Sequence, residues 1–327
     1  VPIVENGYLF LFDEDAAVAA AAERVEMQHG VGLADVELLD GPETERRFPF
    51  VDAGAVRGAT WCPSDGFLRP EVVYGEAAAS ARTRGVRILQ NAPVTEARHA
   101  GGRLTAVKAG GTWLEADLFV DATNAWSARL APILGATMLP VLPIKRHLWF
   151  LVRGDAMTAA ELSRLPMVIS PKGAYCHPEN ADTLMCGWAL PVEAEPDFSD
   201  ADQDRILEAF DHRGGPDSFA FETWLALAEV MPSIGEFAGI QATTCGFYGV
   251  TPDHNPFLGF DTRVPNLLRL VGFSGHGAMF GPFTARVAEV LADAGAAVPS
   301  VTVLGRSAGM APFALDRGFH GHEAMVI

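Results

Sequence analysis

The N-terminal part of the chain changes repeatedly between helical and strand-like patterns of apolar and polar positions. In order, it predicts a strand over residues 7–12, a helix over 16–28, a second helix over 70–84 and a buried strand over 86–89. Asp13 or Asp15 is the candidate cap of the first helix. Pro70 suits the first turn of the second helix, and Gly85 ends it. A helix followed by a short apolar strand is half of a βαβ unit.

Paired glycines divide the next stretch into short strands. Gly101-Gly102 and Gly110-Gly111 supply the positive φ angles that tight hairpins need, so the chain around them predicts a three-stranded meander over 93–99, 103–109 and 112–115. A further apolar strand over 117–121 opens into the small residues of Ala122-Thr123-Asn124-Ala125-Trp126-Ser127. Open α/β sheets bind ligands at such strand ends.

The pattern becomes β-rich and aromatic from about residue 140 to about 259. Two helices are predicted within it, over 199–212, where Ser199 and Asp202 resemble a capping box, and over 216–230. The α/β pattern then returns with a strand over 266–273, the turn Ser274-Gly275-His276-Gly277, and a helix over 281–294 with Pro282 near its first turn. We therefore expect an α/β (α+β) protein with a Rossmann-like domain assembled from residues 62–139 and 263–327 and a β-rich domain from 1–61 and 140–262.

Charge narrows the classes of partner. The 327 residues carry a formal net charge of −17, which repels phosphate backbones and anionic lipid surfaces. The only sizeable basic cluster is Lys145-Arg146-His147 with Arg153, which can serve one small anion but not a nucleic acid duplex. We expect this cluster to be a solvated strand end, with an anionic substrate as the alternative.

The remaining composition is that of a globular protein. Apolar residues make up 49% and charged residues 20%, which excludes disorder, collagen and a coiled coil. We expect a soluble protein, because no apolar run is long enough for a membrane helix and Val1-Pro2-Ile3-Val4-Glu5 does not resemble a signal peptide. The four cysteines form no C-x-x-C pair, so reduced thiols and a cytoplasmic location are expected.

Two stretches carry candidate chemistry. Val271-Gly272-Phe273-Ser274-Gly275-His276-Gly277 leads into a helix, so its glycines let a flat ligand approach the backbone and the helix start offers free N–H groups. Tight packing is the alternative explanation. The stretch from Cys245 to Pro256 contains Thr251-Pro252-Asp253, and its composition alone favours a surface loop in which Asp253 is a local cap over a functional role.

Taken together, these pieces resemble the D-amino-acid oxidase-like flavoproteins, which include glycine oxidase, sarcosine oxidase and dimethylglycine dehydrogenase. The resemblance runs from Gly7 to the end of the chain. It rests on Gly7-Tyr8-Leu9, Asp65-Gly66 with Pro70, Asp121-Ala122-Thr123-Asn124-Ala125-Trp126-Ser127, Thr251-Pro252-Asp253, Ser274-Gly275-His276-Gly277 and Arg317-Gly318-Phe319.

The resemblance implies noncovalent FAD and an enzyme that oxidises the C–N bond of a small amine or N-alkylated amino acid by hydride transfer to flavin N5. Oxygen or another acceptor would take up the electrons. The residues that match cofactor-binding positions are Val94, Ala122, Thr123, Asn124, Trp126, Gly246, Gly272, Ser274, Gly275, His276, Gly277 and Met279. The candidate catalytic residues are Tyr248 and His276, for which a core tyrosine and a packed turn histidine are the alternatives.

The sequence departs from the family at its nucleotide fingerprint. No G-x-G-x-x-G precedes Gly7, although the family begins with a βαβ unit that carries it. The unit is missing from this sequence, or another chain supplies it, or FAD is not held in the family manner. We expect the first, because a sheet without its central strand exposes strand edges. The rival to the enzyme is a noncatalytic subunit or remnant that packs against a partner, and a homo-oligomer is also open.

Single residues depart as well. Asn124 replaces a glycine, Tyr248 falls where glycine oxidase-like members have a carboxylate-binding arginine, and Met279 falls where monomeric sarcosine oxidase has a lysine. Gly246 falls at the cysteine that carries flavin covalently, so Cys245 is expected to be an ordinary buried thiol. P-loop, zincin and hydrolase motifs are absent, and His320-Gly321-His322-Glu323 is expected to be a solvated tail rather than a metal site.

Overall fold

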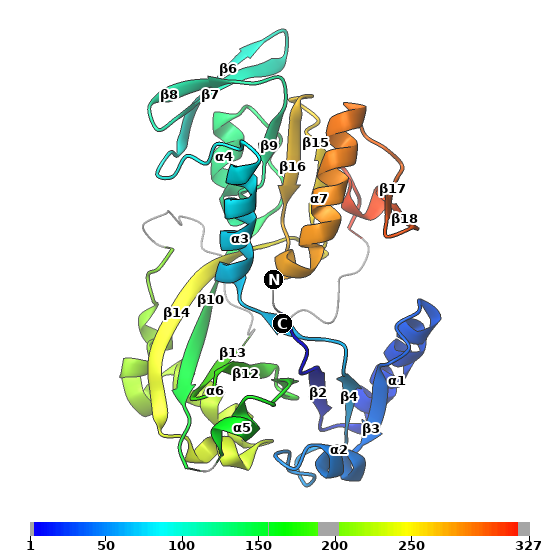
Figure 1. The fold of residues 1–327 in the computed structure, drawn as a ribbon, viewed down its shortest axis with the longest axis vertical. Helices are drawn as coiled ribbons and strands as arrows, with labels where there is room; N and C mark the ends of the chain where they lie inside the picture. Colours follow the sequence, from blue (N-terminus) through cyan, green and yellow to red (C-terminus); the bar gives the residue numbers. More distant parts are fainter. Residues whose placement is uncertain (1–2, 156, 189–202, 320–327) are drawn as a thin grey trace.

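The structure is a computed structural model that describes residues 3–155, 157–188 and 203–319. An eight-stranded mixed sheet forms one end of the molecule, and a smaller three-stranded meander forms the other (Figure 1). The strands of the large sheet, in spatial order, are β14 (Gly239–Val250), β10 (Leu142–Val152), β13 (Thr183–Trp188), β12 (Ala174–Asn180), β11 (Met167–Ile169), β2 (Tyr8–Phe12), β4 (Gly58–Cys62) and β3 (Glu37–Asp40). Neighbours are antiparallel except β11 and β2, which are parallel.

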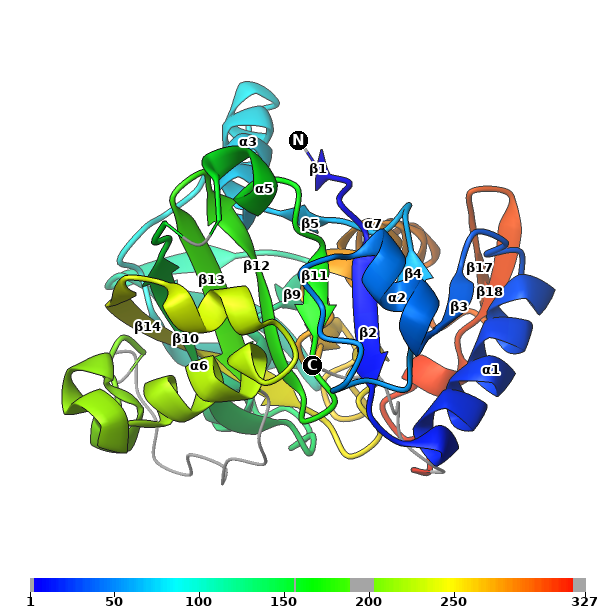
Figure 2. The same cartoon turned by 90° about the horizontal axis from the view of Figure 1, so that it is seen from below.

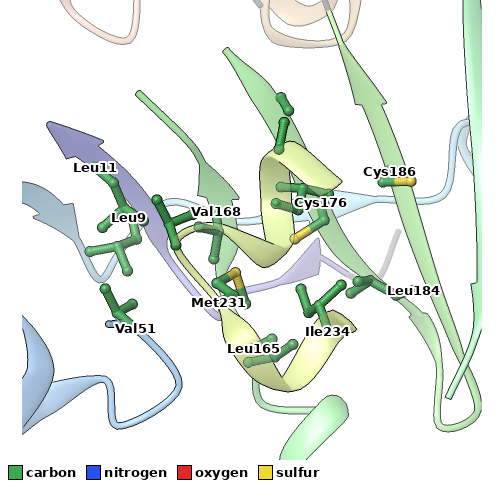
Figure 3. Close-up of a cluster of buried hydrophobic side chains, with 14 of the residues drawn as sticks. Leu9, Leu11, Val51, Leu165, Val168, Cys176, Leu184, Cys186, Met231 and Ile234 are labelled. Atoms are coloured by element: carbon green, nitrogen blue, oxygen red, sulfur yellow. The ribbon is translucent and has the colours of Figure 1, made fainter. Parts of the chain in front are cut away.

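One face of the large sheet carries the main hydrophobic core. Helix α6 (Phe219–Ala228) and the 3₁₀ turn η5 (Pro232–Glu236) cover it, as the view from below shows (Figure 2). Side chains of β2, β11, β12 and β13 meet Met231 and Ile234 there (Figure 3). These residues are almost fully buried, so this layer stabilises the sheet mainly by removing apolar surface from water.

A second sheet, of three strands, is separate from the large one. It has the order β15 (Phe257–Phe260), β16 (Leu267–Val271) and β9 (Phe119–Asp121), with β9 parallel to β16. Helix α7 (Gly277–Ala294) packs on it through Val287 and Leu291. The meander consists of β6 (Val94–Ala100), β7 (Arg103–Ala109) and β8 (Thr112–Glu115), as its paired glycines predict.

The other helices and small ladders complete the chain. Two-stranded ladders join β1 (Ile3–Val4) to β5 (Phe67–Leu68) and β17 (Ser300–Val303) to β18 (Arg306–Gly309). The helices are α1 (Asp15–Gly30), α2 (Gly41–Arg47), α3 (Pro70–Thr83), α4 (Ser127–Ile133) and α5 (Ala159–Leu162), with short 3₁₀ turns η1 (Asn124–Trp126), η3 (Glu208–Phe210), η4 (His212–Asp217) and η6 (Ala311–Phe313). Across the described ranges, none of the helices combines the length and the apolar character that a membrane crossing requires.

Three of the local predictions are wrong. Glu14, not Asp13 or Asp15, is the N-cap of α1, and no side chain caps that helix. Residues 86–89 form no strand, because no strand among the described residues lies beside them to accept hydrogen bonds, and Val86 is 53% exposed. Helix α7 begins four residues earlier than predicted, at Gly277, and therefore contains Pro282 in its interior.

The predicted helix over 199–212 is also wrong wherever it is described. Its first four residues, including Ser199 and Asp202 of the expected capping box, lie outside the described residues. Residues 203–207 form no helix and bond to side chains of the large sheet, and only the single 3₁₀ turn η3 follows them. The carbonyl of Arg205 accepts from Lys145 Nζ at 2.9 Å, and the amide of Leu207 donates to His147 Nε2 at 3.3 Å. These tertiary bonds compete with a helix.

Candidate functional site

Three segments that are far apart in sequence meet at the glycine-rich turn after β16. The side-chain oxygen of Asn124 accepts hydrogen bonds from the amides of Gly272 and Phe273, at 2.9 and 3.1 Å. Asn124 has a φ of 48°, a left-handed conformation that asparagine tolerates better than most residues. The residue that replaces the family's glycine therefore joins the loop after β9 to the turn after β16.

The end of β14 fixes the turn from the other side. The Ser274 amide donates to the carbonyl of Gly249 at 2.9 Å, and the Thr251 amide donates to Ser274 Oγ at 3.1 Å. Gly249 is required by space, since a Cβ there would lie 2.6 Å from Asn124 Oδ1 and 2.9 Å from the backbone nitrogen of Ala125. The loop after β9, the glycine-rich turn after β16 and the end of β14 thus form one packed unit.

Changing Gly249 to alanine is expected to lower the free energy of unfolding by about 1–3 kcal/mol, because the new methyl group must displace the Asn124 loop. Chemical denaturation measures the change. The matched control is Gly246→Ala in the same strand, where a Cβ meets no atom of the described chain within 4 Å. Equal losses in the two variants would contradict the packing that Gly249 shows.

A buried ionic network lies beneath this unit. Arg269 of β16 is fully buried and donates to Asp121 at 2.9 Å, to Asp261 at 2.8 Å and to Ser127 Oγ at 2.7 Å. Burial opposes the ionisation of Asp261, but amide hydrogen bonds from Arg263 and Thr137 and the Arg269 guanidinium outweigh it and lower its pKa. Asp121 in turn accepts from the Thr123 amide and hydroxyl, so the network orients the start of the loop that holds Asn124.

A second ion pair joins two of the motifs that carry the family resemblance. Arg317 contacts Asp253 through both carboxylate oxygens, with distances of 2.7 and 2.8 Å, and its guanidinium lies 3.9 Å above the Phe257 ring. Burial raises the pKa of Asp253, but Arg317 and hydrogen bonds from Asn255 and Thr251 bring the net shift downward. Asp253 is therefore both a local cap, as its loop predicted, and the partner of a distant cation.

Tyr248 connects the turn to the large sheet. A Cβ on Gly275 would lie 2.8 Å from the Tyr248 ring, so the ring packs directly against the turn. Tyr248 shares one face of the sheet with Arg146, which is paired with Gly246, and with Tyr175 and Tyr8 on more distant strands. Burial raises the pKa of Tyr248, although the nearby Arg146 guanidinium acts in the opposite direction, so the hydroxyl keeps its proton at neutral pH.

The opposite face of the same strands holds Lys145 and His147. Lys145 is fully buried with Nζ 4.7 Å from the centre of the Phe247 ring, and His147 is 4% exposed. Burial and then the charge of Lys145 lower the pKa of His147 to about 4. The prediction of a solvated strand end is therefore wrong, because these residues lie in the middle of a covered strand, and only Arg146 points to the half-exposed face.

Cys245 lies on this opposite face too. It is paired in register with His147, and its thiol donates to the carbonyl of Gln203 at 3.4 Å. The thiol is half-buried rather than buried as predicted, and burial raises its pKa. It therefore points away from Tyr248 and the glycine-rich turn. All four cysteines are free.

Some of the other predicted site residues lie at or near the turn, and others lie away from it. Five of them are exposed at or near the strand ends: Ala122, Thr123, Gly275, Gly277 and Met279. Gly246 lies within β14. Trp126 packs edge-on against Phe247, and His276 is the N-cap residue of α7, with its ring 6.5 Å from that of Phe280. Val94 lies apart from the turn and packs into the cluster around Leu104.

Sequence reasoning missed Arg269 and Tyr175. Arg269 lies in a fully buried strand, where a lone arginine between leucines is itself a signal of a paired internal charge. Tyr175 is buried on the same face of the large sheet as Tyr248, with β13 and β10 between their two strands, and only the strand order shows this. Within the described ranges, no group of three histidine, cysteine or carboxylate side chains could hold a metal ion, and residues 320–323 lie outside them.

Comparisons with known proteins identify the family of the chain. The family model described as "FAD dependent oxidoreductase", DAO, matches residues 1–291, so the chain belongs to this family. FAD-dependent oxidoreductase domain-containing protein 1 of Xenopus laevis is 26% identical over 325 residues, covering 89% of this chain and 61% of that protein. Human mitochondrial sarcosine dehydrogenase is 22% identical, with 85% of this chain and 29% of that protein covered. The chain thus spans less than two thirds of the length of these relatives.

Two solved structures share the fold. L-Proline dehydrogenase of P. horikoshii matches with a TM-score of 0.77 at 24% identity, covering 90% of this chain and 74% of that one. Glycine oxidase of Geobacillus kaustophilus matches with a TM-score of 0.77 at 21% identity, covering 97% of this chain and 76% of that one. The α/β fold class expected from the sequence is confirmed.

The glycine-rich turn fits the flavin part of the family cofactor, FAD. Gly275 and Gly277 are exposed, and the amides of Gly277, Ala278 and Met279 lie in the first turn of α7, where the helix has no carbonyl to accept their hydrogen bonds. Partial positive charge gathers at such a helix end and suits a ring that becomes more negative on reduction. The pyrophosphate part has no glycine fingerprint in these 327 residues.

Proposed function

We propose that the chain contributes the substrate face and the flavin-facing turn of an enzyme that oxidises the C–N bond of a small amine or N-alkylated amino acid. The observation that carries the proposal is the contact between the Tyr248 ring and Gly275, since it brings a polar side chain of the large sheet to the exposed turn. We also propose the two-domain division over 62–139 with 263–327 and 1–61 with 140–262, with the proposed site at their junction.

When bound, FAD would supply the two-electron oxidant. The exposed Gly275, Gly277 and Met279 would hold it at the turn. The buried Gly272 and Ser274, together with Asn124, would fix the shape of the turn beside it. The first-turn amides of α7 would stabilise negative charge, and the Tyr248 hydroxyl would orient the amine by a hydrogen bond. A neutral amine needs no strong base, so His276 is proposed to close the turn rather than to move a proton.

The proposal is tested on the whole protein by its absorption spectrum and by oxidation of N-methylglycine and N,N-dimethylglycine with a dye acceptor and with oxygen. We expect a flavin band and turnover of at least one amine. A colourless protein that takes up no added FAD and oxidises no amine would instead support a noncatalytic scaffold.

Tyr248→Phe is expected to lower kcat/KM for the amine about five- to tenfold, the worth of one hydrogen bond, while the flavin absorption per protein stays the same. Tyr74→Phe on α3 is the matched control, because Tyr74 is exposed and distant in sequence from every site residue. Identical kinetics in Tyr248→Phe and the parent protein would remove the substrate-orienting role.

A further inference from the structure

We propose that a cleft beside the meander binds a small amino acid with a cationic side chain, at a site separate from the glycine-rich turn. The cleft has a volume of about 570 Å³ and lies between β7, the end of β8 and the start of β16. Pockets for small molecules have volumes in this range. The proposal depends on neither FAD nor amine oxidation, because the residues that line the cleft take no part in the candidate functional site.

The cleft opens where the ladder between β7 and β8 stops. The register of this ladder ends with the pair Ala106 and Glu115, so residues 103–105 of β7 have no neighbour in β8. The side chain of Asn266 replaces that neighbour, since it accepts from the Leu104 amide at 3.0 Å and donates to the Leu104 carbonyl at 2.8 Å. Leu104 and Asn266 are both buried and form the inner part of the lining.

The cleft and the glycine-rich turn lie at opposite ends of β16. Asn266 directly precedes this five-residue strand, and the turn follows it. A strand of this length separates the two places by about 17 Å. The meander also lies at the end of the molecule away from the large sheet (Figure 1). A ligand in the cleft is therefore not in contact with Tyr248 or with the first turn of α7.

Charges of both signs line the cleft without neutralising one another. Arg103 is exposed in β7, and Glu115 and Asp117 are exposed where the chain leaves β8. Across the described residues, these three side chains form no ion pair and no side-chain hydrogen bond. Elsewhere in the meander, by contrast, Lys108 and Glu96 are paired at 2.7 Å. The charges of the cleft thus stay available to a ligand.

The signs of these charges define the ligand. A guanidinium matches a carboxylate with two parallel hydrogen bonds, and each acid side chain can accept from one ammonium group. Two carboxylates and one guanidinium therefore fit an amino acid with a second cationic group, such as lysine. The net charge of −17 also favours a ligand of net positive charge over a neutral amino acid. Exposed charge pairs are weak, so we expect a dissociation constant of about 1 mM.

Thermal melting at constant ionic strength tests this charge pattern with three compounds. Norleucine lacks the second ammonium group of lysine, and 1,5-diaminopentane lacks its carboxylate. At about ten times the expected dissociation constant, lysine should raise the melting temperature of the protein more than either of the other two. Equal shifts with all three compounds, or no shift with lysine, overturn the proposal.

Three substitutions assign the charges to the groups of the ligand. Arg103→Gln should remove the advantage of lysine over 1,5-diaminopentane, and Glu115→Gln combined with Asp117→Asn should remove its advantage over norleucine. Titration calorimetry should show lysine binding weakened about three- to tenfold by each change. All three side chains are exposed, so the variants are expected to fold.

The matched controls for these variants are Arg87→Gln and Glu45→Gln. Both residues are exposed and lie outside the lining of the cleft, so the two controls should bind lysine like the parent protein. Lysine binding that is equally strong in the parent protein and in the cleft variants contradicts the site.

A last variant fills the cleft and keeps all of its charges. Ala116 is exposed in the lining, so Ala116→Phe should weaken lysine binding about tenfold by taking up the space of the ligand. Ala77→Phe on α3, at another exposed alanine, is the matched control and should leave binding unchanged. If Ala116→Phe binds lysine as the parent protein does, the ligand lies elsewhere on the surface and the proposal is wrong.

Discussion

Replacing Arg269 with methionine is expected to lower the free energy of unfolding by about 3–5 kcal/mol, the usual cost of leaving a buried charge without its partner. The loss is large because two fully buried carboxylates, Asp121 and Asp261, depend on this one guanidinium. The variant should also bind FAD more weakly, since Asp121 orients the loop that holds Asn124 against the turn.

Chemical denaturation and a flavin titration measure both effects. Arg263→Met is the matched control, because Arg263 follows Asp261 closely in sequence but is exposed, and it should change stability by about 0.5 kcal/mol at most. Arg269→Lys should recover only part of the loss, because an ammonium cannot reach both carboxylates and Ser127 at once. Similar stabilities for Arg269→Met and Arg263→Met would mean that the network contributes little.

Acidification from pH 6.5 to pH 4 is expected to cost the folded protein about 3 kcal/mol through His147 alone. Its pKa is about 4 in the folded state, against about 6.5 in an unfolded chain. Between these values the unfolded state binds a proton that the folded state does not, so stability falls as the pH falls. Burial first and the neighbouring Lys145 second keep His147 neutral.

His147→Gln should remove this part of the pH dependence. Denaturation curves at several pH values between 4 and 8 would show a shallower loss for the variant below pH 6.5, and parallel behaviour above pH 7.5, where the histidine is neutral in both states. The Leu207 amide loses its weak bond to His147 in the variant, which shifts the whole curve but not its slope. Equal slopes in the two proteins below pH 6.5 would show that His147 becomes charged without penalty.

Local sequence signals correctly predict those elements whose backbone geometry they determine. Gly-Gly pairs require positive φ angles, and both of them form the hairpins of the meander. Pro70 and Gly85 bracket α3 because one suits a first helical turn and the other ends the helix. The glycine-rich turn likewise lies between a strand and a helix, β16 and α7, as its sequence predicts, and its contact with a ligand stays a proposal.

The other parts of the fold and the candidate site depend on contacts between residues that are far apart in the sequence. The stretch over residues 86–89 has the composition of a buried strand, but a strand needs a neighbour, and apolar composition alone does not supply one. Lys145, Arg146 and His147 form one basic run in the sequence, yet the pleat of β10 sends them to two faces with different charges and burial. Arg269 meets a carboxylate 148 positions away, a pairing that no local pattern contains.

The ion pair between Asp253 and Arg317 gives the last described segment of the chain a role far from its own position. Arg317 follows Asp253 by 64 positions, and Thr251, two residues before Asp253, bonds to Ser274 of the glycine-rich turn. A proteolytic cut or an engineered truncation placed before Arg317 would strip a buried carboxylate of its counter-charge and loosen the turn from behind. Fusion partners for purification or imaging are therefore better attached beyond this arginine.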